Sequence, residues 1–154
     1  MPSPMNEQAK VIKGYCLRAL SLRDCFTAQL RQKIAKKYPE VDQEIVDSVL
    51  TELTASKLLD DTRAIAILVR KLIASGKGYY YFQSKLKSLS VGQEVLRNAS
   101  DYYSVQEEKD VAARLIAKAN PQDKPAKLKL FRLLQSRGFR SSAFGHLFDY
   151  QSSF

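Results

Sequence analysis

The spacing of apolar residues constrains the fold of this chain most, because it follows the helical period almost throughout. Apolar side chains recur at i, i+3 and i+4, which places them on one face of an α-helix. The first two such stripes consist of Val11, Ile12, Tyr15, Cys16, Ala19 and Leu20, and of Leu30, Ile34 and Tyr38. No sustained alternation of β-branched residues with period two is present, so strands are not expected. The pattern predicts an all-α fold of nine helices.

Helix-breaking residues separate these stripes. The breaks lie at Pro39, at Gly76 and Gly78, at Asn120 and Pro121, and at Gly138. Gly138 has the position of a residue that closes a helix in the left-handed conformation. The apolar spacing begins near residue 10, so residues 1–9 are expected to form a flexible N-terminus.

The stripes also suggest an internal repeat. Large apolar pairs four residues apart occur three times, at offsets of about 50 residues, and each is followed by a break and a further apolar cluster. The pairs are Leu30 and Ile34, Phe82 and Leu86, and Leu130 and Leu134. We predict three units of three helices, over residues 10–60, 61–104 and 105–151, stacked end to end with shared cores. A helical array without true repeats would give a similar pattern.

Composition and charge narrow the functional class. The chain has 154 residues, 45% of them apolar, but no apolar run long enough to cross a membrane. The N-terminus lacks the order of a signal peptide, so we expect a cytoplasmic protein with no membrane contact. The net charge is +9, and residues 61–104 and 105–154 each contribute +4 of it. Such an excess favours a polyanionic partner, either nucleic acid or an acidic protein surface, over a role in solubility alone.

No residue set predicts catalysis, a metal site or a cofactor. His146 is the only histidine and has no nucleophile beside it in the sequence. Cys16 and Cys25 are too few for a zinc site or a disulfide framework. The pair Asp60 and Asp61 precedes a helical stripe, where short carboxylates cap backbone N–H groups, so both are predicted to be structural caps. We expect a protein without enzymatic activity.

The aromatic run at residues 79–82 is the least usual feature. Only one or two of four consecutive helical residues can face a core, and Phe82 is the best candidate because Leu86 follows it by four. At least one tyrosine is then exposed beside Lys77 and Lys85. The tyrosines either contact a partner or pack against the neighbouring unit, and both roles can apply to different rings.

Four segments resemble the RecX family. Residues 58–63, Leu-Leu-Asp-Asp-Thr-Arg, resemble its Leu-Asp-Asp-x-Arg junction between the first two repeats. Arg23 and Asp24, followed by residues 28–34, are similar to its Arg-Asp…Glu-Leu-x-x-Lys-Leu helix. Residues 76–78 and 82–86 resemble its Gly-containing turn and the helix after it. Residues 127–134 and 137–139, the latter Arg-Gly-Phe, resemble its third-repeat signature.

The resemblance covers about residues 10–150 in order, with some local departures. Phe26 stands where the family has a capping Ser, Ala64 replaces an aromatic residue, Tyr79 replaces a Pro and Tyr81 a basic residue. The resemblance implies an elongated, curved array of three three-helix repeats that lies in the groove of the RecA filament on DNA. It implies inhibition of recombinase, ATPase and coprotease activities, and hence modulation of DNA repair and the SOS response.

We therefore expect a monomeric regulator with the RecA filament as partner and single- or double-stranded DNA as a further one. The alternative is a basic helical protein that binds DNA directly. Binding is assigned to exposed basic and tyrosine residues of the second and third units. These candidate residues are Lys77, Tyr79, Tyr80, Lys85, Lys87, Lys127, Lys129, Arg132, Arg137 and Arg140.

Overall fold

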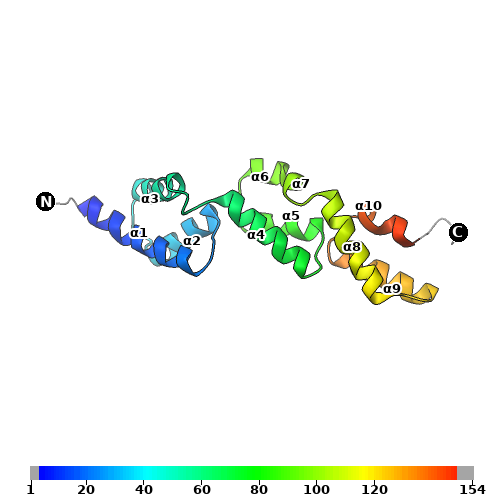
Figure 1. Cartoon of the computed structure of the whole chain (residues 1–154). Coiled ribbons are helices and arrows are strands. Elements are labelled where there is room, and N and C mark those ends of the chain that lie inside the picture. The colour runs from blue at the N-terminus through cyan, green and yellow to red at the C-terminus, as the bar shows by residue number, and fades with distance from the viewer. Residues whose placement is uncertain (1–3, 149–154) are drawn as a thin grey trace. The chain divides into compact units, whose positions relative to one another are not determined.

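The computed structural model describes residues 4–148, and every regular element within them is a helix (Figure 1). The all-α prediction is confirmed. The elements are, in order, α1 (Pro4–Leu22), α2 (Thr27–Lys37), α3 (Gln43–Ala55), α4 (Asp61–Ala74), α5 (Tyr79–Ser88), α6 (Gln93–Arg97), α7 (Ala99–Tyr102), α8 (Val105–Ala119), α9 (Lys124–Ser136), α10 (Ser141–Phe144) and the 3₁₀-helix η1 (Gly145–Phe148).

Two of the nine predicted helices are each divided in two. The sixth is interrupted at Asn98, a weak helix former with φ −100° and ψ 15°, which gives α6 and α7. The ninth consists of α10 followed directly by η1. The predicted breaks after the second, fourth, seventh and eighth helices agree with the structure. Asn120 and Gly138 adopt positive φ values of 44° and 86° after α8 and α9.

The N-terminus differs from the sequence prediction. Residues 4–9 are the first turns of α1 rather than a flexible segment. Met5, Gln8 and Ala9 are good helix formers, and Glu7 lies in the first turn, where a carboxylate favours the helix dipole. Residues 1–3 of that prediction and the last residues of the third predicted unit lie outside the described residues.

The described chain forms two compact units. Unit 1 contains the residues up to 65 together with 89–91, and unit 2 contains residues 66–88 and those from 92 onward. The boundary falls within α4. The division into three repeats of residues 10–60, 61–104 and 105–151 stays a prediction.

Unit 1 has a core contributed by α1, α2 and α3. Its buried side chains come from the predicted stripes, and the loop before α4 adds one more. They are Ile12, Cys16, Leu30, Ile34, Val46, Val49, Leu50, Leu53 and Leu59. Unit 2 has a core built from α8, α9 and the helices after them, lined by Val111, Ala112, Leu130, Leu134, Phe139, Phe144 and Phe148.

Asp60 and Asp61 are both caps, but of different helices. Asp60 Oδ1 accepts hydrogen bonds from the backbone N–H groups of Thr62 (3.0 Å) and Arg63 (3.2 Å) at the start of α4. Asp61 Oδ1 instead accepts from the backbone N–H (2.7 Å) and the hydroxyl (3.0 Å) of Thr27, the first residue of α2. Phe26 precedes α2 without a side-chain acceptor, so Asp61 supplies the missing cap. The prediction that both residues are structural caps is confirmed. The sequence did not predict that Asp61 caps α2 rather than α4.

Within residues 4–148, none of the helices is both long enough and apolar enough to cross a membrane.

Candidate functional site

The predicted aromatic–basic surface lies on α5. Phe82 is fully buried, whereas Tyr80 and Tyr81 are 55% and 41% exposed. The expectation that at least one tyrosine is exposed is confirmed. Lys85 and Lys87 are also exposed. Tyr81 and Lys85 are four residues apart and share one face of the helix, which makes a continuous tyrosine–lysine surface.

Lys77 lies in the turn before α5 and is partly held by neighbours. Its ammonium group lies 4.9 Å from the centroid of the Tyr81 ring. Its backbone carbonyl accepts a 2.7 Å hydrogen bond from the hydroxyl of Tyr103. Burial, with a smaller contribution from the charge of Glu108, raises the pKa of the Tyr103 hydroxyl above its usual range, so this donor stays protonated. The turn therefore presents Lys77 in a defined position.

Tyr79 and Arg140, both assigned to the contact surface from sequence, meet inside unit 2. The guanidinium carbon of Arg140 lies 4.0 Å from the centroid of the Tyr79 ring. Glu108, fully buried on α8, accepts hydrogen bonds from Arg140 Nε (2.7 Å), from the Arg140 backbone N–H (3.2 Å) and from the Tyr79 backbone N–H (2.7 Å). The Arg140 side chain is 16% exposed. In the structure these two residues join elements of unit 2, and their assignment to a contact surface stays a prediction.

Two glycine turns meet beside this cluster. The Gly78 N–H donates to the carbonyl of Arg137 (3.0 Å), and the Tyr80 N–H donates to that of Gly138 (2.8 Å). A Cβ atom on Gly78 would lie 2.4 Å from the Phe139 nitrogen, and one on Gly138 would lie 2.4 Å from the Tyr81 nitrogen. Arg137 is half-buried here. The sequence analysis identified both glycine turns as helix breaks but did not predict that they contact each other. The glycines themselves were the only sign in the sequence of a close backbone approach.

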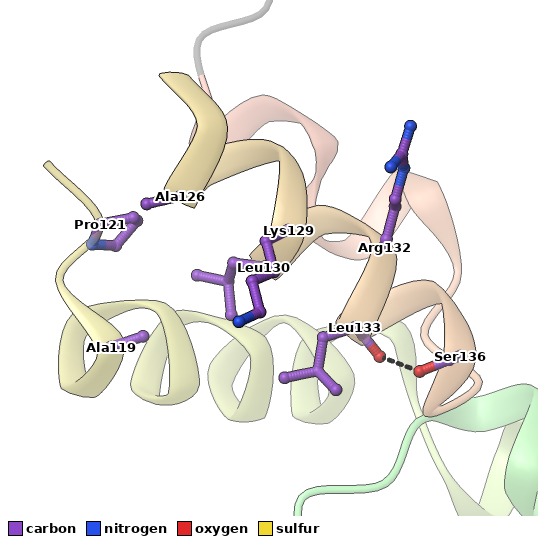
Figure 2. A pocket seen from close by; sticks show the side chains of 8 residues that line it. All are labelled: Ala119, Pro121, Ala126, Lys129, Leu130, Arg132, Leu133 and Ser136. Atoms are coloured by element: carbon purple, nitrogen blue, oxygen red, sulfur yellow. Dashed lines mark hydrogen bonds between the residues drawn. The ribbon is translucent and has the colours of Figure 1, made fainter. Parts of the chain in front are cut away.

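A second candidate surface lies along α9. A cavity of about 490 Å³ opens between this helix and the end of α8 (Figure 2). It is lined by Ala119, Pro121, Ala126, Lys129, Leu130, Arg132, Leu133 and Ser136. In Figure 2 the Lys129 side chain extends toward α8, whereas Arg132 points away from the floor. Leu133 is 43% exposed and adds apolar surface to the groove. Lys129 and Arg132 place two cations at the margin of this apolar groove.

Lys127 does not belong to this groove. It is exposed, but it precedes Lys129 by two residues and therefore points to the opposite side of α9. The predicted basic set of the third unit is thus dispersed: Lys129 and Arg132 share the groove, Lys127 faces elsewhere, and Arg137 and Arg140 are partly buried.

The described residues contain no group of three or more His, Cys, Asp or Glu side chains able to hold a metal ion. His146 is exposed in η1, and Cys16 and Cys25 are buried thiols in unit 1.

Comparison with known proteins identifies the family. No family model matches the chain. A curated protein named Regulatory protein RecX, from Actinobacillus pleuropneumoniae serotype 5b (strain L20), is 30% identical over 143 residues, which cover 88% of this chain and 89% of the relative. The chain belongs to the RecX family. The RecX resemblance stated from sequence motifs is therefore confirmed.

Solved RecX structures share the fold. The crystal structure of RecX from Lactobacillus salivarius has a TM-score of 0.79 and 13% identity, covering 96% of this chain and 99% of that one. A second crystal structure, of regulatory protein RecX, has a TM-score of 0.73 and 22% identity, covering 92% of this chain and 73% of that one. The RecX helical array is thus retained where few residues are identical.

Proposed function

We propose that this RecX-family chain is a regulatory protein that binds the RecA filament on DNA. By binding, it inhibits the recombinase, ATPase and coprotease activities of RecA and so modulates DNA repair and the SOS response. The observation that carries the proposal is the 30% identity to a regulatory protein RecX over 88% of the chain. The protein acts as a monomer through binding, without chemistry of its own.

The exposed face of α5 is one contact surface. Tyr80, Tyr81, Lys85 and Lys87 combine aromatic area with positive charge on one short helix. Tyrosine is enriched in protein interfaces because a rigid ring gives contact area at a small entropy cost, while lysines attract acidic side chains or phosphates. Lys77 extends this surface at the turn.

The groove of α9 is the other contact surface. Its apolar floor accepts apolar side chains of a partner, and Lys129 and Arg132 attract the carboxylates or phosphates around them. Tyr79, Arg137 and Arg140 support these surfaces from inside unit 2.

An ATPase titration tests the proposal. A cognate RecA is assembled on single-stranded DNA, and its ATP hydrolysis is measured while this protein is added. We expect inhibition at substoichiometric amounts. Unchanged ATPase and strand exchange at all ratios would contradict the function.

Matched variants test the surfaces. Lys129→Gln/Arg132→Gln should raise the concentration needed for half-inhibition. Arg70→Gln/Lys71→Gln removes the same charge from exposed positions of α4 and should leave inhibition unchanged. Equal effects of the two variants would show that only net charge matters and would remove the groove from the contact surface.

The net charge of +9 favours one alternative, direct binding to duplex DNA. In that case the protein binds naked duplex tightly, log K falls steeply with log salt, and RecA activity changes only through loss of free DNA.

A further inference from the structure

Unit 1 contains a cavity of about 500 Å³ that none of the proposed contacts uses. Its lining residues come from α1, the segment after it, and α2. They are Tyr15, Arg18, Ala19, Leu22, Arg23 and Lys33. Half of them are cationic and none is acidic.

Helical spacing explains how α1 supplies most of this lining. Tyr15, Arg18, Ala19 and Leu22 lie at i, i+3, i+4 and i+7, a single face of the helix. Arg23 follows directly after α1. Lys33 comes from α2 and is half-buried.

The net charge of residues 1–60, only +1, conceals a strong separation of charge. Residues 8–39 contain eight basic residues and one acidic residue, and the acids of unit 1 lie mainly after them. Two of the eight cations pair with α3: Lys13 with Glu52, and Arg31 with Asp47.

The three cavity cations have no such partner. Asp24, the one acid in the segment, is bound by Arg63, with Arg63 Nη2 2.9 Å from Asp24 Oδ1. Within residues 4–148, Arg18, Arg23 and Lys33 make no ion pair. Like charges that line one concavity repel each other, and an anion placed among them relieves that repulsion.

We propose that this cavity binds a phosphate group of a nucleic-acid backbone. Two guanidinium groups and an ammonium group form charge-assisted hydrogen bonds with phosphate oxygens. The Tyr15 ring and Leu22, which is 86% exposed, lie beside these cations and offer apolar surface to the attached sugar or base. Inorganic phosphate would leave that surface unused.

This site is independent of the proposed RecA contact. It lies in unit 1, whereas the α5 and α9 surfaces lie in unit 2, and it is tested without RecA. Loss of one activity therefore leaves the other measurable.

The test is the fluorescence anisotropy of a labelled oligothymidylate mixed with the full chain at several NaCl concentrations. Arg18→Gln/Arg23→Gln/Lys33→Gln should weaken binding on the order of tenfold or more and reduce the salt slope by about 0.7, the contribution of the one single-strand phosphate that the cavity binds. The control Lys10→Gln/Lys36→Gln/Lys37→Gln removes the same charge from exposed positions of the same two helices and should keep the slope.

Equal losses in the two triple variants would overturn the proposal, because net charge alone would then explain binding. Calorimetric titration with inorganic phosphate separates the sources of phosphate. Binding of inorganic phosphate without binding of the oligonucleotide would overturn the assignment to nucleic acid. Circular dichroism checks folding, and Arg18→Glu/Arg23→Glu, which changes only exposed residues, repeats the test if Lys33 proves necessary for stability.

Discussion

Among the described residues, Glu108 is the one charged residue that is fully buried. It connects segments that are far apart in the sequence. Its two oxygens accept three hydrogen bonds, from Tyr79 and Arg140. A buried carboxylate is tolerated only when it is paired and hydrogen-bonded. Its role is therefore to hold the start of α5 and the residue before α10 against α8.

Removing this carboxylate should destabilise the protein strongly. Glu108→Ala leaves Arg140 and the Tyr79 N–H without an acceptor and should lower the free energy of unfolding by about 3–5 kcal/mol. Glu108→Gln, which keeps one acceptor oxygen, should cost about 2 kcal/mol. Urea unfolding measures both, with Glu94→Ala at an exposed position as the control. A loss below 1 kcal/mol in Glu108→Ala would contradict the structural role.

Cys16 makes stability depend on pH in the alkaline range. Burial, and secondly Cys25, raises the pKa of the Cys16 thiol to about 11. The folded state thus holds this proton more tightly than the unfolded state, so the stabilisation is complete below about pH 9 and is lost as pH rises toward 11. The loss is about 2 kcal/mol. Urea unfolding at pH 7.5 and 10.5 should show a smaller decrease for Cys16→Ala than for the wild type, and equal decreases would refute this.

At the scale of helices, side-chain caps and glycine turns determine where the helices begin and end. Asp61 caps α2 through Thr27, whereas its neighbour Asp60 caps α4. Because adjacent residues serve different helices, their removal should have separable local effects.

Asp61→Ala should destabilise unit 1 by about 1–2 kcal/mol and speed amide hydrogen exchange at the N-terminus of α2. Asp60→Ala should cost a similar amount but act on the first turn of α4. Hydrogen exchange followed by mass spectrometry or NMR separates the two. If Asp61→Ala left the Thr27 amide protected, the proposed cap would be wrong.

Gly138 should not tolerate a side chain. Its φ is +86°, and an added Cβ would meet the Tyr81 backbone. Gly138→Ala should therefore cost more than about 2 kcal/mol and disturb the contact between the two turns. Gly145→Ala is the matched control, since its Cβ meets nothing within 4 Å and its φ is −55°. Thermal unfolding compares them, and similar melting temperatures would contradict the close approach.

At the scale of the whole molecule, the net charge of +9 governs association. If the RecA filament on DNA is the partner, inhibition should weaken as NaCl rises from about 50 to 200 mM, because cations on the protein displace counterions of the polyanion. The ATPase of RecA alone at each salt concentration is the control. Inhibition independent of salt would assign binding to the apolar and aromatic contacts instead.

The sequence by itself determined the all-α class, most helix boundaries, the capping role of Asp60 and the positive charge. These properties depend on residues close in sequence, whose spacing and chemistry act locally. The helical period also predicts that Lys127 and Lys129, two residues apart, point to opposite sides of α9.

Only the tertiary structure shows that Asp61 caps α2 and that Tyr79 and Arg140 meet at Glu108. It also shows which cations around the unit 1 cavity have no ion-pair partner. Each depends on partners 29 to 34 residues away or on lining residues from separate helices. Apolar periodicity identifies a buried face but not the segment packed against it. The burial of Glu108 could not be predicted for that reason: its position in the first turn of α8 is typical of an exposed acid, and only the approach of Arg140 makes its burial favourable.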